Sequence, residues 1–152
     1  MKVRPAQRSE AGELTELAMA SKAHWGYDEA FLASCREELT LHPADIGRHR
    51  TTVVEEDGRV LGFTTLEGAP PRGALGMMFV APDVIGRGIG RVLFEHTATE
   101  ARRLGFVRLT IDADPNAEAF YLTMGAVRIG ATPSGSIPGR VLPLLEVGLT
   151  SR

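Results

Sequence analysis

A glycine-rich segment in the middle of the chain has the residue types that bind a large anion. Residues 86–91 read Gly-Arg-Gly-Ile-Gly-Arg, after an apolar run that ends at Pro82 and before apolar residues at helical spacing up to Leu104. We expect a strand, a tight turn and a helix N-terminus, where free backbone N–H groups and the helix dipole attract negative charge. Glycines let the anion approach the backbone. The segment predicts a pyrophosphate cradle formed by Arg87, Gly88, Ile89, Gly90 and Arg91.

The glycines alone leave several interpretations open. A P-loop requires G-x-x-x-x-G-K-S/T, which the chain lacks, and a Rossmann fingerprint requires G-x-G-x-x-G near the first strand of a βαβ unit. Here the spacing is G-x-G-x-G and the segment lies mid-chain. A nucleotide-binding domain of another kind and an ordinary tight turn into a helix therefore remain alternatives at this stage.

The stretch Val80–Leu93 resembles the acetyl-CoA-binding motif of the GCN5-related N-acetyltransferase (GNAT) family, usually written Gln/Arg-x-x-Gly-x-Gly/Ala. Ile85 stands at the Gln/Arg position, which is a departure from the family pattern. Since the family's Gln or Arg often helps to hold the phosphates, we expect Arg87 and Arg91 to take over more of that role here.

A second stretch, residues 114–126, resembles the family segment Asn-x-x-Ala-x-x-x-Tyr-x-x-x-Gly-Phe, with tighter spacing and with Ala126 in place of the aromatic residue. The two motifs have the family's order and about its separation. Together the resemblance covers roughly residues 2–130. It implies that acetyl-CoA is the cosubstrate and that its acetyl group passes directly to an amine, with no enzyme nucleophile.

The resemblance also implies roles for residues beside the cradle. The backbone of the preceding strand, including Phe79 and Val80, holds the pantetheine arm and polarises the thioester carbonyl, and Asn116 contacts the pantetheine. Tyr121 takes the position of the general acid, because a phenol with a pKa near ~10 stays protonated at neutral pH and can donate to the leaving thiolate. The alternative for Tyr121 is a core aromatic beside Phe120.

The general base is less constrained by the sequence. Related enzymes often carry a glutamate in the strand before the cradle, but residues 72–76 contain no acid. The candidates are Glu67 at the end of the preceding strand, Asp112 at the end of the next strand, and His24. A water chain is a further alternative, and each candidate side chain could equally be a solvated or capping residue.

Two irregular segments are expected to flank the acceptor amine, as their counterparts do in the family. They are Lys22–Tyr27 and Ser134–Arg140. Trp25 could form an aromatic wall for the acceptor or a plug at the domain edge, and Arg140 could bind a carboxylate or be an ordinary loop arginine. The predicted acceptor-side residues are His24, Trp25, Tyr27 and Arg140.

Composition sets limits on the class of protein. A chain of 152 residues fits one domain, 1–152, and its net charge of −2 gives no reason to expect a nucleic-acid partner. The apolar runs are too short for a membrane span, and the N-terminus lacks a signal-peptide core. Cys35 is the single cysteine, which excludes an internal disulfide and suggests no metal site. We expect a cytoplasmic protein, and a homodimer is left open.

Hydrophobic spacing predicts a mixed, mostly antiparallel sheet with helices on both faces, which also matches the order of elements in the acetyltransferase family. Helices are expected to begin near Ser9, Asp28, Gly90 and Asp114, and Asp57-Gly58 is a strong hairpin signal. Strands are expected at residues 2–5, 51–56, 60–66, 74–80, 107–111, 126–129 and 142–149.

We therefore expect an N-acetyltransferase that uses acetyl-CoA and a small-molecule or peptide amine. The alternative is a non-catalytic module that binds acetyl-CoA as a sensor, since the strand glutamate is missing and Ile85 departs from the motif.

Overall fold

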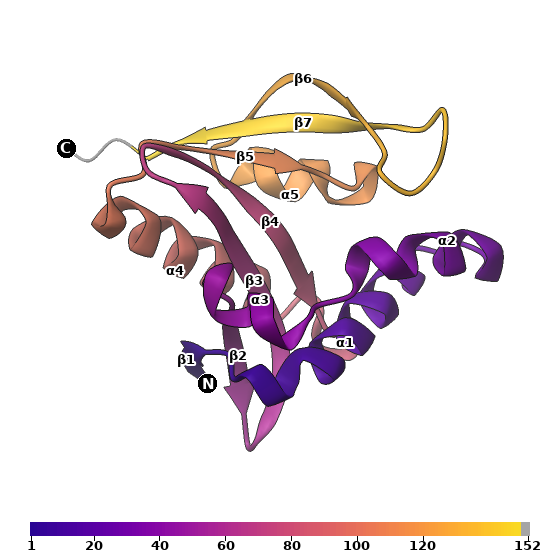
Figure 1. Cartoon of the computed structure of the whole chain (residues 1–152), viewed down its shortest axis with the longest axis horizontal. Coiled ribbons are helices and arrows are strands. Elements are labelled where there is room, and N and C mark those ends of the chain that lie inside the picture. Colours follow the sequence, from indigo (N-terminus) through magenta and orange to yellow (C-terminus); the bar gives the residue numbers. More distant parts are fainter. Residues whose placement is uncertain (150–152) are drawn as a thin grey trace.

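A seven-stranded sheet forms the centre of the computed structural model, which describes residues 1–149 (Figure 1). The strand order is β1-β2-β3-β4-β5-β7-β6, and every neighbouring pair is antiparallel except β4 and β5. The predicted mixed, mostly antiparallel sheet is confirmed. The strands are β1 (Lys2–Pro5), β2 (Thr52–Glu56), β3 (Arg59–Ala69), β4 (Arg72–Val80), β5 (Arg108–Asp112), β6 (Val127–Pro133) and β7 (Val141–Gly148).

Helices cover both faces of the sheet because each strand places alternate residues on opposite sides. On one face, α1 (Ala11–Ala23), α2 (Glu29–Leu39) and α3 (Pro43–Arg48) bury side chains against Val53 and Phe63. On the other face, α4 (Ile89–Leu104) packs Ile89 and Leu93 against Val54 and Leu61, and α5 (Glu118–Thr123) joins a separate apolar cluster through Tyr121. Short 3₁₀ turns, η1 (Arg8–Glu10), η2 (Pro82–Val84) and η3 (Pro115–Ala117), connect the elements.

Local sequence signals explain several of these boundaries. The Asp28 carboxylate accepts a hydrogen bond from the Phe31 amide at 2.8 Å, as predicted for an N-cap, and Gly105 ends α4 at φ 97°. The predicted hairpin at Asp57-Gly58 is present, with both residues at positive φ.

One local prediction is wrong. Ser9 does not cap the first helix; it lies inside η1, which Gln7 caps through a capping box with Glu10. After α2 ends at Leu39, Pro43 begins the short helix α3, at a position where the missing proline N–H has no partner inside the helix anyway.

The sheet is divided where β4 and β5 diverge. These parallel strands pair only at their first residues, from Arg72–Arg108 to Ala74–Thr110, and then separate (Figure 1). A bulge falls at the same point of β4, since Thr65 faces Met77 and Leu66 faces Leu75, so Gly76 has no residue opposite it. The divergence leaves one edge of β4 free beyond Ala74.

Candidate active site

Two cavities meet in this part of the fold, and the larger of this pair, with a volume of about 480 Å³, lies in the gap between the diverging strands. Its walls bring together segments that are far apart in the sequence. They include Met77, Met78, Phe79 and Val80 of β4, the cradle residues Gly86, Gly88, Ile89, Gly90 and Arg91, and the side of η3 and α5 that carries Asn116, Phe120 and Tyr121.

The glycine turn presents free backbone amides to this cavity. Gly86 and Gly88 adopt left-handed φ values of 94° and 84°, and Gly88 precedes the first turn of α4 without a side-chain cap. Within residues 1–149, the N–H groups of Ile89, Gly90 and Arg91 have no hydrogen-bond acceptor, whereas the Val92 amide bonds to Gly88. These free N–H groups at a helix N-terminus suit a phosphate group.

Only one of the two cradle arginines lies at the cavity. Arg91 lines it. Arg87 is not part of the wall, and its guanidinium donates to both carboxylate oxygens of Glu56 at 3.1 Å. The structure thus places the Arg87 guanidinium on Glu56, 31 residues away in the sequence, and not at the cavity wall. The phosphate-binding role of Arg87 stays a prediction.

Tyr121 is 5% exposed and lines the larger cavity from α5. Its ring packs against Phe120 and Phe94, with centroids 5.4 and 6.3 Å away. Burial of the phenol, together with the nearby Asp114 carboxylate, raises the pKa of Tyr121 well above its usual value. The hydroxyl thus stays protonated at neutral and moderately alkaline pH, as a proton donor requires.

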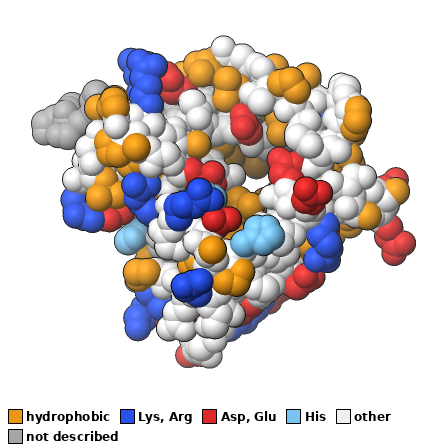
Figure 2. All heavy atoms as spheres, viewed as in Figure 1, with side chains coloured by type: hydrophobic (Ala, Val, Ile, Leu, Met, Phe, Trp, Pro, Cys, Tyr) orange, Lys and Arg blue, Asp and Glu red, His pale blue; other side chains and the backbone are white. Residues whose placement is uncertain are grey.

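The smaller cavity, of about 340 Å³, lies on the face of the sheet covered by α3. Figure 2 shows acidic side chains around a hollow on this face. The wall includes Glu67 and Asp112, two of the predicted base candidates, and both cavities share Glu38, Leu75, Gly76, Met77 and Asp112. The two cavities therefore meet at the β4 bulge.

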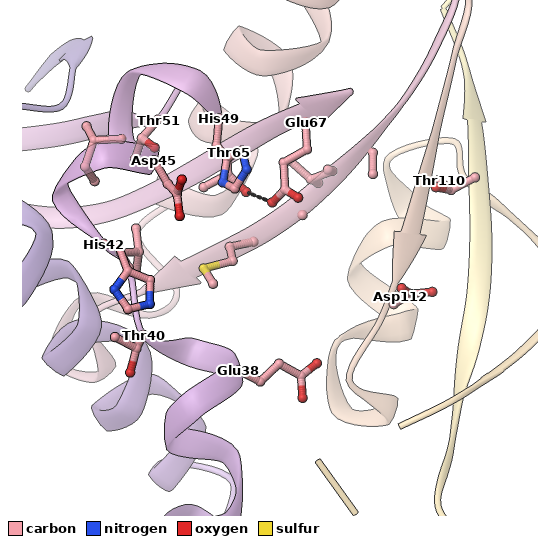
Figure 3. Close-up of a pocket in the computed structure, with 16 residues that line it drawn as sticks. Glu38, Thr40, His42, Asp45, His49, Thr51, Thr65, Glu67, Thr110 and Asp112 are labelled. Carbon is pink, nitrogen blue, oxygen red and sulfur yellow. Dashed lines mark hydrogen bonds between the residues drawn. The ribbon is translucent and has the colours of Figure 1, made fainter. Parts of the chain in front are cut away.

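The Glu67 carboxylate, which accepts a hydrogen bond from Thr65 (Figure 3), lies directly over the Gly76 backbone. A Cβ at Gly76 would stand 1.7 Å from Glu67 Oε2 and 2.4 Å from its Cδ. The Thr65 hydroxyl donates to the same oxygen at 2.9 Å. Glu67 on β3 thus fills the space that a side chain at position 76 of β4 would occupy. A glycine inside a strand is a known signal for close approach, but the sequence does not reveal which group approaches.

The remaining acceptor-side predictions have mixed outcomes. Trp25 is 43% exposed and lines the larger cavity, which favours a wall over a plug. His24 lines neither cavity and packs edge-on against Trp25, so the structure gives no support for it as a base or acceptor residue.

Tyr27 and Arg140 belong to a polar network around Asp114. The Asp114 carboxylate accepts from Lys22 Nζ at 2.7 Å and from the Tyr27 hydroxyl at 3.0 Å, and Arg140 donates to that hydroxyl at 2.9 Å. Asn116 donates its side-chain amide to both Asp114 and Tyr27. Arg140 also lines the larger cavity while its guanidinium is bonded to the Tyr27 hydroxyl, so its carboxylate-binding role stays a prediction. The network ties both irregular segments to η3 beside Tyr121.

Replacing Asp114 by asparagine should lower the free energy of unfolding by about 2 kcal/mol at pH 7, because Lys22 and Arg140 lose a half-buried charge partner. Burial alone raises the Asp114 pKa, but Lys22 and the Asn116 amide outweigh burial and lower it. Because the folded-state pKa of Asp114 is below its unfolded value, the ionised carboxylate stabilises the fold above about pH 4. This contribution to stability is lost on acidification. The difference from wild type in urea denaturation should therefore shrink by pH 3.

The matched control for this prediction is Asp83→Asn. Asp83 also pairs with an arginine, Arg59, but its side chain is 62% exposed. We expect the control to change stability much less than Asp114→Asn does, because solvent screens an exposed ion pair. Equal losses in the two variants would contradict a special role of the Asp114 network.

Comparison with known proteins agrees with this geometry. The family model of the acetyltransferase (GNAT) family matches residues 13–126. The chain belongs to this family. Peptidyl-lysine N-acetyltransferase YiaC of Escherichia coli is 36% identical over 96 residues, and the match spans 62% of this chain and 62% of that protein.

Solved GNAT structures share the fold over nearly the whole chain. A GCN5-related N-acetyltransferase of Rhodopseudomonas palustris superposes with a TM-score of 0.77 at 25% identity, over 97% of this chain and 94% of that one. The PaiA N-acetyltransferase of Thermoplasma acidophilum, solved with coenzyme A, gives a TM-score of 0.78 at 18% identity over 97% and 98%. The second likeness shows the fold alone.

No helix within residues 1–149 has both the length and the apolarity to cross a bilayer. The same residues contain no cluster of three or more His, Cys, Asp or Glu side chains arranged to hold a metal ion.

Proposed function

We propose that this chain is an N-acetyltransferase that transfers the acetyl group of acetyl-CoA directly to a primary alkyl amine, either a small molecule or a lysine side chain. The observation that carries the proposal is the meeting of two cavities at the β4 bulge, one with free cradle amides and one with carboxylates. The name of the relative YiaC, a peptidyl-lysine N-acetyltransferase, supports an amine acceptor. The proposal includes a cytoplasmic location, in keeping with the free, buried thiol of Cys35.

The residues of the larger cavity fit acetyl-CoA, which supplies the acetyl group when bound. The amides of Ile89, Gly90 and Arg91 would hold the pyrophosphate, together with the Arg91 side chain. The free edge of β4 near Phe79 and Val80 offers backbone groups to the pantetheine arm and the thioester carbonyl. No side-chain nucleophile is needed for direct transfer.

Glu67 is the general base in this proposal. An alkyl amine with a pKa near ~10.4 is protonated at neutral pH and must lose a proton before its nitrogen can attack. The Glu67 carboxylate stands at the meeting point of the cavities, where Gly76 gives it room. Asp112 lines both cavities at this point and adds negative charge that attracts the ammonium group.

Tyr121 is the general acid. As the C–N bond forms and the C–S bond breaks, the leaving thiolate takes the phenolic proton, which the raised pKa of Tyr121 keeps in place at neutral pH. Proton transfer from the amine to Glu67 and from Tyr121 to sulfur leaves the enzyme to be reset by exchange with solvent.

The proposal is tested by following free-thiol release from acetyl-CoA with pentylamine and with a lysine-containing peptide. Acceptor-dependent release is expected with at least one of these amines. Binding of acetyl-CoA without release for either amine would favour the sensor alternative, and no thermal stabilisation by saturating acetyl-CoA would contradict both functions.

The two cradle arginines give a matched pair for the cosubstrate site. Arg91→Ala should raise the KM for acetyl-CoA by about 10-fold, since a charge-assisted phosphate contact is lost. Arg87→Ala should change it by less than about twofold, because Arg87 pairs with Glu56 away from the cavity. Equal effects of the two variants in steady-state kinetics would reject this assignment.

A further inference from the structure

The smaller cavity extends well beyond the place where it meets the larger one. Figure 3 shows Glu38 and Asp112 at one end, and Asp45, His49 and Thr51 at the other. The second group, with His42, comes from α3 and its flanks, and we call these four residues, His42, Asp45, His49 and Thr51, the distal end. The cavity has a volume of about 340 Å³ and extends from the Glu67 carboxylate to the distal end.

The wall of this cavity carries negative charge without a lining cation. Four carboxylates line it, and the lining residues include neither lysine nor arginine; the carboxylates are Glu38, Asp45, Glu67 and Asp112. Arg48, at the outer side, binds Asp45 through Oδ1 only and lowers the pKa of Asp45, with smaller contributions from His49 and His42. Asp45 therefore stays ionised, and the cavity favours positive charge along its whole length.

A buried hydroxyl at the distal end lacks a partner. Thr51 is 3% exposed, and within residues 1–149 its Oγ1 is the one buried side-chain oxygen or nitrogen without a hydrogen bond. Its backbone is satisfied, since the Thr51 amide donates to Ile46 and its carbonyl accepts from Ala6. An unpaired buried hydroxyl destabilises the fold, so a hydrogen-bond donor placed at the distal end would relieve this cost.

We propose that the acceptor carries a second protonated amine, which binds at the distal end between Thr51 and Asp45 while the first amine reacts beside Glu67. The acceptor class is thus a linear diamine or polyamine. This inference rests on the proposed N-acetyltransferase function. The second ammonium keeps its proton and takes no part in bond formation; it supplies binding energy and sets the distance between the two nitrogens.

The test compares 1,5-diaminopentane with pentylamine, two acceptors of equal chain length. We expect kcat/KM to be at least about 10-fold higher for the diamine, the gain of one charge-assisted contact. Acetylation of pentylamine with an equal or better kcat/KM would overturn the inference and leave the proposed function intact. Acetylation of neither amine, nor of a lysine peptide, would instead contradict the proposed function.

Variants at the distal end decide whether the preference comes from this subsite. Thr51→Val, which keeps the side-chain shape, and Asp45→Asn should each reduce the ratio of diamine to pentylamine kcat/KM to below about threefold. Glu16→Gln removes an exposed carboxylate outside both cavities and should leave the ratio as in wild type. An unchanged ratio in both distal variants, or a lysine peptide preferred over the diamine, would overturn the inference.

Discussion

Replacing Tyr121 by phenylalanine should lower kcat by about 10²- to 10⁴-fold, the usual contribution of a positioned general acid. The aromatic ring would keep its packing against Phe94 and Phe120, so the fold and the dissociation constant of acetyl-CoA should change little. The loss should be confined to the chemical step, which stopped-flow measurement of thiolate release isolates from binding.

The other tyrosine of the chain provides the control. The Tyr27 hydroxyl bonds to Asp114 and Arg140 and lies outside both cavity walls. Tyr27→Phe should lower kcat by less than about 10-fold. Because burial and Asp114 raise the Tyr121 pKa, wild-type kcat should also show no alkaline loss up to about pH 10. A Tyr121→Phe enzyme with wild-type kcat would remove this residue from the acid role.

Gly76→Ala should abolish most activity although it adds a single methyl group. The new Cβ would lie 1.7 Å from Glu67 Oε2, so the carboxylate must leave its place at the bulge. We expect kcat to fall by about 10²- to 10³-fold, as for loss of a general base. Gly130→Ala is the matched control, because Gly130 also lies at a bulge in a strand and has nothing within 4 Å of the added Cβ.

Combining substitutions shows whether Gly76 acts through Glu67. Glu67→Gln should lower kcat to about the level of Gly76→Ala, and the double variant should be no worse than either single one, since both remove the same positioned carboxylate. Multiplied losses in the double variant would mean that Gly76→Ala acts by another route, such as disturbing the backbone of β4.

The parts of the fold that sequence reasoning predicted correctly depend on neighbours in the chain. Asp28 caps the amide of a residue three positions later, and Asp57-Gly58 needs only its own backbone geometry to turn a hairpin. The turn at residues 86–91 is local in the same way, which is why its position before α4 could be inferred.

The parts that sequence reasoning missed depend on partners far along the chain. Arg87 fits a phosphate site by its position, but the fold brings Glu56 to it. Arg140 lines the larger cavity as an acceptor-side residue should, but its bond to Tyr27, 113 residues away in the sequence, could not be inferred from its own segment. Glu67 was one of three base candidates. Its position became clear only from the structure, in which the bulge of β4 leaves room for the Glu67 carboxylate over Gly76. Nothing in the sequence marked Thr51 as a site residue, because the helix α3, which forms the cavity wall beside it, was not predicted.

The divergence of β4 and β5 also has a mechanical consequence. Strands β1–β4 form one half of the sheet and β5–β7 the other, and within the sheet three residue pairs, Arg72–Arg108 to Ala74–Thr110, join β4 to β5. A long ligand lying in the gap would serve as a surrogate strand that braces the two halves against each other. On this view the protein without a ligand would be the more compliant form, and a cosubstrate bound in the gap would stiffen it.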